Sequence, residues 1–150
     1  TPVSFLKYWE NDVATKEKVK NGWLYTGDFA YKDEEGYFYF KGRKDDIINT
    51  SGYRVGPSEV EDAILSHPEV NMVAVIGVPD KLRGQIIKAF IVTADQKNVL
   101  TQNDKLKQSI QNHVKLRLAV HEYPRLIEFI YELPLTTTGK IIRKDLRENN

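Results

Sequence analysis

The chain has 150 residues, of which 41% are hydrophobic and 29% charged, a composition typical of a soluble globular protein. Its 22 Lys and Arg residues nearly balance its 21 Asp and Glu residues, so no charge footprint indicates binding to nucleic acid or to an anionic membrane surface. The absence of cysteine excludes disulfides and thiol chemistry and weakly favours a reducing compartment, and no apolar run approaches the roughly 20 residues of a transmembrane segment. The sequence begins with neither an initiator Met nor a signal-peptide pattern, so we expect it to be cut from a longer protein.

The first predicted elements are a short helix and a β-hairpin. Residues 14–20 are rich in Lys and Glu and predict one short helix. Two aromatic runs within residues 29–40 surround an acidic turn that contains a glycine, a pattern typical of a hairpin. We place a domain boundary after this hairpin, near Lys44 and Asp45.

Residues 42–54 carry two arginines, Arg43 and Arg54, on either side of the sequence Asn49-Thr50-Ser51-Gly52. A Ser-Gly pair marks a turn, since glycine accepts a positive φ, and the stretch predicts a small polar hairpin. Arginine can bind a phosphate or a carboxylate through two parallel hydrogen bonds. The alternative is that both arginines are solvated side chains beside a turn.

Beyond this hairpin, helices and strands are mixed along the chain. A helix begins near Pro57, which is tolerated in a first turn, and Ser58 and Glu61 have capping-box spacing. Together with the elements below, it predicts an α+β fold, in which helices cover a small, mostly antiparallel three-stranded sheet with a β-hairpin. The further predicted elements are buried strands at residues 70–78 and 85–94, an amphipathic helix at 104–118, a strand at 125–131 with Ile127, Phe129 and Tyr131 on one face, and a short basic helix at 141–147.

Two further positions could carry chemistry. Asp28 follows Thr26-Gly27, and its carboxylate could accept two hydrogen bonds from a vicinal diol such as a ribose; the alternative is an Asp that caps a turn. Lys140 ends a hydroxyl-rich loop that is similar to a phosphate cradle, although Pro134 stands where a Walker A motif has its first glycine. We place Lys140 at the start of the last helix, where a lysine opposes the helix dipole and gains by meeting an anion. The alternative is a solvated loop lysine.

In this order and with these separations, the motifs resemble the C-terminal part of the adenylate-forming enzymes, the superfamily of acyl-CoA synthetases, peptide-synthetase adenylation domains and luciferases. The resemblance covers essentially all 150 residues. Residues 25–28 are similar to its TGD motif, segments of residues 42–61 to its hinge motif, and residues 134–141 to its last motif, whose lysine is catalytic. Residues 46–61 look most like the branch of medium-chain acyl-CoA and acetyl-CoA synthetases.

The resemblance implies a division of the chain and a two-step reaction. Residues 1–44 are expected to be the β-rich C-terminal tail of a large N-terminal adenylation domain, and residues 45–150 the mobile C-terminal domain. A small carboxylic acid, such as a fatty acid, attacks the α-phosphate of Mg-ATP to give acyl-AMP and pyrophosphate, and the thiol of coenzyme A then displaces AMP. ATP and coenzyme A are therefore expected substrates, and Mg²⁺ is expected mainly in the N-terminal domain rather than at a metal site here.

The phosphate loop, adenine pocket and acyl pocket of such enzymes precede residues 25–28. We therefore expect the 150 residues alone to be inactive. The intact protein is expected in the cytoplasm or, in a eukaryote, in an organelle matrix.

The resemblance also implies residue roles. Asp28 would hold the ribose hydroxyls, Arg43 would help fix the ribose and phosphate, and Arg54 would contact the nucleotide phosphate. Lys140 would bridge the substrate carboxylate and the α-phosphate as charge develops. Asp45 would be the hinge about which the small domain rotates between the two half-reactions. Coenzyme A contacts are implied for Ser51, Gly52, Tyr53, Arg83, Tyr123, Pro124 and Arg125.

A different class of function stays open at this stage: a non-catalytic small domain that binds a nucleotide, coenzyme A or a protein partner by itself. Micromolar binding of ATP by the 150 residues alone would favour that alternative. If the chain is instead the C-terminal part of a larger enzyme, we expect it to bind ATP only weakly by itself, because most nucleotide contacts lie upstream.

Overall fold

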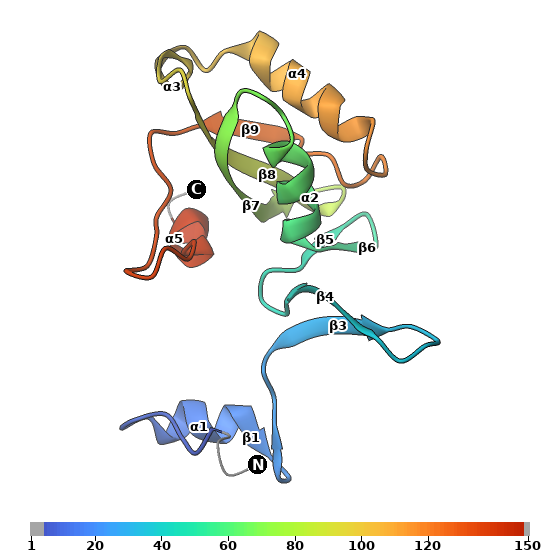
Figure 1. Ribbon diagram of the computed structural model, residues 1–150, viewed down its shortest axis with the longest axis vertical. Coiled ribbons are helices and arrows are strands. Elements are labelled where there is room, and N and C mark those ends of the chain that lie inside the picture. The colour runs from blue at the N-terminus through green and yellow to red at the C-terminus, as the bar shows by residue number, and fades with distance from the viewer. Residues whose placement is uncertain (1–4, 149–150) are drawn as a thin grey trace. The chain divides into compact units, whose positions relative to one another are not determined.

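The computed structural model describes residues 5–148, and the chain divides into two compact units between Asp45 and Asp46. We call residues up to Asp45 unit 1 and residues from Asp46 onward unit 2; both are drawn in Figure 1. That residues 1–44 belong to a larger domain stays a prediction.

From residue 5 to residue 45, unit 1 consists of one helix and two β-hairpins. The side chain of Asn11 accepts a hydrogen bond from the Ala14 N–H and so caps the helix. The helix ends at Lys18, so the prediction of helix up to residue 20 is wrong at this end: Val19 and Lys20 form a strand instead. The elements are α1 (Asp12–Lys18), β1 (Val19–Lys20), β2 (Trp23–Leu24), β3 (Asp28–Lys32) and β4 (Phe38–Arg43), with β1 antiparallel to β2 and β3 antiparallel to β4.

Unit 1 buries almost none of its apolar side chains. Among residues 5–45, Gly42 alone is buried. Trp23 and Phe38 are each 74% exposed, and the stacked rings of Tyr31 and Tyr39, with centroids 4.8 Å apart, are half-exposed. The described part of this unit therefore has no hydrophobic core of its own.

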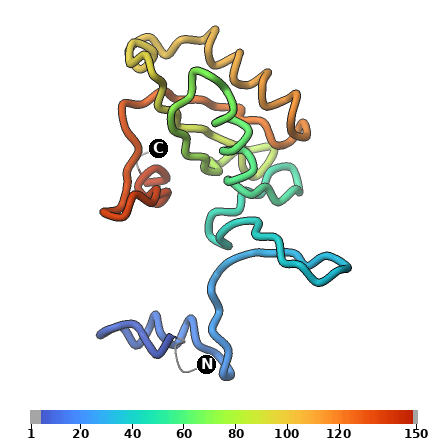
Figure 2. The backbone as a smooth tube through the Cα atoms, viewed as in Figure 1, coloured from blue at the N-terminus to red at the C-terminus, as the bar shows by residue number. Residues whose placement is uncertain are grey.

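In its described part, residues 46–148, unit 2 contains a five-stranded sheet and four helices. Four strands are antiparallel in the order β6-β5-β8-β7, and β9 pairs in parallel with β8. The strands are β5 (Ile48–Thr50), β6 (Tyr53–Val55), β7 (Val70–Asp80), β8 (Gly84–Thr93) and β9 (Leu126–Phe129). The helices are α2 (Pro57–Leu65), α3 (Lys97–Thr101), α4 (Asp104–Lys115) and α5 (Arg143–Glu148). The backbone tube in Figure 2 shows the segment after β9 running down one side of this unit to α5.

The two faces of the sheet carry two separate hydrophobic clusters. Successive side chains of a strand point to opposite faces, so Val75 of β7 joins one cluster and Ile76 joins the other. The first cluster includes Ile64 of α2 and Ile110 of α4, and the second includes Leu146 of α5. Strand β7 lies at the edge of the sheet order but is covered on both faces, which explains why residues 70–78 are almost continuously apolar.

The predicted α+β fold class is confirmed, with one change in the sheet. The polar hairpin β5–β6 is not separate from the predicted strands, because Thr50 pairs with Gly84 at the start of β8. The sheet therefore has five strands rather than three. The predicted strand at residues 125–131 is shorter, and Tyr131 lies half-exposed beyond its end instead of sharing the face of Ile127 and Phe129.

The helix boundaries also differ from the predicted ones. The residue before α2 is Gly56, which makes no side-chain capping bond, so Ser58 and Glu61 form no capping box. The predicted helix at residues 104–118 ends at Lys115, although Leu118 still packs against the core. Helix α3 was not predicted, since its five residues are too few to show a periodic apolar face.

Candidate functional site

Asp28 and Arg43 lie directly opposite each other at the end of the β3–β4 hairpin. Their carboxylate Oδ1 and guanidinium Nε are 3.6 Å apart, and both side chains are largely exposed. The turn before the hairpin is bonded by Thr26, whose hydroxyl accepts the N–H of Asp28 at 3.2 Å. The carboxylate of Asp28 is therefore directed by Arg43 and is not the cap of this turn.

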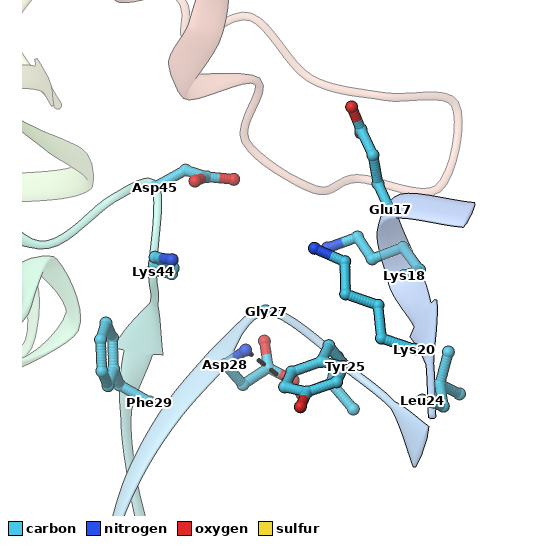
Figure 3. A pocket seen from close by; sticks show the side chains of 11 residues that line it. Glu17, Lys18, Lys20, Leu24, Tyr25, Gly27, Asp28, Phe29, Lys44 and Asp45 are labelled. Carbon is cyan, nitrogen blue, oxygen red and sulfur yellow. Dashed lines mark hydrogen bonds between the residues drawn. The ribbon is translucent and has the colours of Figure 1, made fainter. Parts of the chain in front are cut away.

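An open cavity of about 880 Å³ lies beside Asp28, within unit 1. Gly27 lines it with a φ of +82°, a conformation that favours glycine, and its carbonyl accepts the N–H of Lys44 at 2.7 Å. In Figure 3 the side chains of Lys18 and Lys20 extend toward the open space from one side, and Lys44 lies on another. The cavity therefore combines three carboxylates, Glu17, Asp28 and Asp45, with several cations, and so offers both acceptors for ribose hydroxyls and donors for a phosphate.

The turn between β5 and β6 lies next to the turn between β7 and β8. Ser51 and Gly52 have φ values of +51° and +86°, the left-handed pair that a tight two-residue hairpin requires. The N–H of Ser51 donates to the carbonyl of Arg83 at 2.9 Å, which joins the two turns. The ring of Tyr53 stacks on His121, with centroids 3.8 Å apart and planes 14° apart. Residues 51–53 are thus held by contacts on two other segments.

Asp80 lies among the predicted coenzyme A contacts. Its Oδ1 accepts the N–H of Arg83 at 2.8 Å, and that bond, with the N–H of Leu82 and the charges of Arg83 and Arg125, holds the pKa of the Asp80 carboxyl below its usual value. Arg125 donates to the hydroxyl of Tyr123 at 3.0 Å. The Asp80 carboxylate also lies 3.8 Å from Nη1 of Arg83 and so orients that basic side chain at this end of the sheet.

The residues predicted to contact coenzyme A come together at this one end of the sheet, from three segments of the chain. Sequence reasoning missed the residues that hold them. Gln111 donates to the carbonyl of Pro124 at 3.0 Å, and the ammonium of Lys115 lies 4.3 Å from the ring centroid of Tyr123. Both lie on α4, and only the tertiary fold brings that helix to residues 123–125; for Asp80, its position just before a turn was a usable signal.

Lys140 lies in a tight loop and not at a helix start, so the prediction that it opposes a helix dipole is wrong. Leu135 pairs with Ile141 in an antiparallel bridge, and α5 begins only at Arg143. The carbonyl of Lys140 accepts the N–H of Thr136 at 2.8 Å, while its N–H donates to the Thr136 hydroxyl at 3.0 Å. The side chain of Lys140 is exposed, and its ammonium has no ion-pair partner within residues 5–148. A rigid backbone therefore presents a solvent-facing cation.

A cluster of four charged residues, which we call the ionic cluster, lies where α5 meets α2 and β7. Arg143 donates through Nη2 to both carboxylate oxygens of Glu61 at 2.7 Å, and its Nη1 lies 3.7 Å from Asp46. Arg147 also pairs with Asp46. Glu61 Oε1 accepts the N–H of Val75 at 2.8 Å. None of these pairings was predicted, and no local pattern indicates them because Glu61 and Arg143 are 82 positions apart.

Asp28 and Arg43 belong to unit 1, whereas Arg54 and Lys140 belong to unit 2. Arg54 is exposed on β6, opposite Asn49. Within unit 2, the segment that carries Lys140 and the β5–β6 hairpin lie on different sides of the sheet (Figure 1). The structure therefore separates the predicted catalytic lysine from the predicted coenzyme A contacts.

Across residues 5–148, no group of three or more His, Cys, Asp or Glu side chains is arranged to hold a metal ion. In the same part of the chain, none of the helices combines the length and apolarity needed to cross a membrane.

Comparison with known proteins places the chain in a family. Residues 59–140, more than half of the chain, match the family of AMP-binding enzyme C-terminal domains. Over 148 residues the chain is 51% identical to human mitochondrial acyl-coenzyme A synthetase ACSM1, covering 98% of this chain and 26% of that protein. It is 46% identical to the uncharacterized acyl–CoA ligase YtcI of Bacillus subtilis, covering 99% of this chain and 27% of that protein.

A solved structure shows the same similarity. The anthranilate CoA ligase AuaEII, in complex with anthranoyl-AMP, matches with a TM-score of 0.83 and 39% identity over 96% of this chain and 27% of that chain. The chain spans about a quarter of the length of the curated relatives it matches. The resemblance inferred from the motifs is confirmed: the chain belongs to the family of AMP-binding enzyme C-terminal domains.

Proposed function

We propose that this chain is the C-terminal portion of an AMP-forming acyl-CoA synthetase, an acid–thiol ligase that activates a carboxylic acid with ATP and transfers the acyl group to coenzyme A. One observation carries the proposal: unit 2 presents an exposed lysine on a rigid loop at one side and a cluster of basic and aromatic side chains at another. Two chemically different surfaces on one small domain suit a reaction in two steps.

In the first step, a carboxylate oxygen of the acid attacks the α-phosphorus of ATP, and the bond to the β-phosphate oxygen breaks. The products are acyl-AMP and pyrophosphate. The ammonium of Lys140 lies between the attacking carboxylate and the α-phosphate, where it stabilises the negative charge that develops and transfers no proton. Asp28 accepts hydrogen bonds from the ribose hydroxyls, with Arg43 beside it holding the ribose and phosphate.

Arg54 contacts the nucleotide phosphate in the same complex. Its exposure on β6 supports that role.

In the second step, the sulfur of coenzyme A attacks the acyl carbonyl carbon. The thiol proton is lost to solvent, the carbon–oxygen bond to AMP breaks, and AMP leaves with that bonding pair. The pantetheine arm passes the turn at Ser51 and Gly52, where an added Cβ at Gly52 would have no neighbour within 4 Å and the backbone is open to a ligand. Arg83 and Arg125 supply the positive charge that the phosphates of coenzyme A require.

We also propose that unit 1 is the tail of the large N-terminal adenylation domain and that the mobile domain begins at Asp45. The exposed aromatic rings of unit 1, including Trp23 and Phe38, support this, because they form a core only when further chain covers them. Such a tail would bring Asp28 and Arg43 to the active site of that larger domain.

The experiment that tests the function uses the intact protein. We expect exchange of labelled pyrophosphate into ATP that requires a carboxylic acid but no coenzyme A, and loss of coenzyme A thiol only when all three substrates are present. A series of straight-chain and aromatic acids serves as the panel. Absence of acid-dependent exchange across that panel, in a folded protein, contradicts the proposal.

A further inference from the structure

Arg143 connects the loop that carries Lys140 to the first residue of unit 2. On one side it follows the antiparallel bridge between Leu135 and Ile141 by only two residues. On the other it reaches Asp46, which directly follows the predicted hinge residue Asp45. The side chains of Arg143 and Asp46 are 19% and 17% exposed, so this contact is largely removed from solvent.

Glu61 gives the guanidinium of Arg143 a defined orientation. One carboxylate oxygen of Glu61 is already bonded to the N–H of Val75, so Glu61 is fixed to the middle of strand β7. Both Glu61 oxygens then accept from Nη2 of Arg143, while Nη1 faces Asp46. The Nε of Arg143 is buried without a hydrogen-bond partner within the described chain, so the guanidinium is set by its two carboxylates alone.

The Lys140 loop has little else to hold it on the sheet. Within the loop, bonds run between Thr136 and Lys140, and the N–H of Ile142 donates to the carbonyl of Pro134 at 2.8 Å. These bonds shape the loop but do not attach it to unit 2. Attachment comes from the buried side chains of Leu133 and Leu146 and the partly buried Ile141, which can slide in an apolar layer, and from the directional contacts of Arg143.

We propose that Arg143 is a positioning residue for Lys140. Held between Glu61 and Asp46, it fixes the lysine loop to the same rigid body that begins at the hinge, so that rotation about Asp45 delivers Lys140 to the α-phosphate in a single placement. This inference rests on the proposed function, because it assigns Lys140 its role in adenylation. Misplacement of a catalytic group by about 1 Å can cost on the order of 10²-fold in rate, which is why such a loop needs a rigid anchor.

The test uses Arg143→Lys in the intact enzyme, since lysine keeps the charge but cannot reach both carboxylates with a planar group. We expect adenylation kcat to fall by at least about tenfold, with the KM for ATP little changed, because the nucleotide contacts lie elsewhere. Thioester formation from supplied acyl-AMP is expected to stay within about twofold. Hydrogen exchange of the peptide that contains Thr136 and Lys140 should become faster, a readout that does not depend on activity.

Lys144→Ala is the matched control, because Lys144 lies on the same helix and its one ion pair within residues 5–148 is with exposed Glu148 at 3.6 Å. Lys144→Ala should change neither the rate of adenylation nor the hydrogen exchange of the Lys140 loop. If Arg143→Lys is unfolded at the assay temperature, Glu61→Gln decides, since it keeps an acceptor for the Val75 N–H and removes the charge that holds Arg143. Equal loss in both half-reactions, or unchanged adenylation, overturns the inference.

Lys140→Ala is measured alongside to separate this inference from the proposed function. If Lys140→Ala leaves adenylation intact, the proposed function itself fails. If Lys140→Ala abolishes adenylation while Arg143→Lys and Glu61→Gln both retain it, only the positioning role fails.

Discussion

The N–H of Ser51 donates to the carbonyl of Arg83 at 2.9 Å, and this bond sets two turns side by side that are 32 positions apart in the chain. It places a turn with an open backbone next to a basic side chain held by Asp80. In the proposed function, the pantetheine arm of coenzyme A passes the open turn and its phosphates meet Arg83. The relationship leads to the first prediction, which concerns Arg83.

In the intact enzyme, Arg83→Ala is expected to raise the KM for coenzyme A by about tenfold, the scale of one charge-assisted hydrogen bond at a partly exposed site. Adenylation should be unchanged, because Arg83 lies away from the Lys140 loop. Steady-state coenzyme A consumption and pyrophosphate exchange measure the two effects. Lys81→Ala removes the same charge from the same turn and serves as the control. An equal effect of both variants would indicate general attraction instead of a specific contact.

The second prediction concerns Lys140. Lys140→Ala should lower adenylation by on the order of 10²–10³-fold or more, the loss typical for one preorganised donor facing developing charge. Thioester formation from supplied acyl-AMP should survive, because the lysine is expected to leave the site before that step. Pyrophosphate exchange and acyl-AMP consumption separate the two. Equal losses in both half-reactions would make Lys140 a structural residue.

The third prediction concerns pH and rests on two histidines between α2 and α4. His67 is 7% exposed and lies 3.1 Å from the Ser109 hydroxyl, and His113 lies 2.7 Å from the Ser66 hydroxyl; the two rings meet edge to face, 5.1 Å apart. Burial lowers the pKa of both histidines; for His113 the charges of Arg117 and His67 lower it further, whereas Glu69 partly offsets the shift at His67. Both rings are therefore neutral in the folded state at neutral pH.

Because the folded pKa values lie below the unfolded value of about 6.5, the unfolded chain binds more protons once the pH falls below it. The free energy of unfolding should thus decrease as the pH drops from about 7.5 to about 5.5. Urea unfolding of the 150-residue chain at several pH values measures this. His113→Gln should flatten the dependence in that window, because it removes one of the two histidines whose pKa is lowered. A steeper decline in His113→Gln would contradict the assignment.

The sequence predicted those elements and motifs that depend on residues close together in the chain. Strands β7 and β8 were predicted from their apolar runs, and α4 from apolar residues spaced four positions apart. Both patterns arise because the buried positions of a strand or a helix recur at fixed intervals along the sequence. Asp28 and Lys140 were singled out from short sequences that contain a glycine directly before them, and their roles stay predictions. That β9 pairs in parallel with β8 could not be found, because pairing depends on where the intervening chain returns.

Local sequence patterns also could not identify the residues that support the candidate site. Glu61 shows why: its spacing from Ser58 predicts a capping box, yet its carboxylate bonds to Val75 and Arg143. Glu61 therefore pairs with residues far along the chain and not with the start of its own helix. An acidic group in the interior is stable only when it is paired. His121 gives a second case, because its stacking on Tyr53 joins segments 68 positions apart.

The last prediction concerns Asp45 and follows from the placement of two surfaces on unit 2. The Lys140 loop and the turn at Ser51 and Gly52 lie on different sides of the sheet, so one fixed pose of this unit cannot present both to the same nucleotide. Rotation between two poses resolves the conflict, and a hinge needs only a few residues that absorb the change in φ and ψ. Asp45 is the last residue of unit 1, and no helix or strand contains it.

Proline at this position fixes φ near −65°, removes an N–H and restricts Lys44. In the intact enzyme, Asp45→Pro is therefore expected to leave adenylation within about tenfold and to suppress thioester formation far more, because it traps the first pose. Pyrophosphate exchange compared with coenzyme A consumption from supplied acyl-AMP measures the split. Asp45→Ala, which keeps the N–H and both dihedral freedoms, is the control and should retain both activities. Loss of adenylation alone would mean that proline trapped the second pose, and unchanged rates in both half-reactions would place the hinge elsewhere.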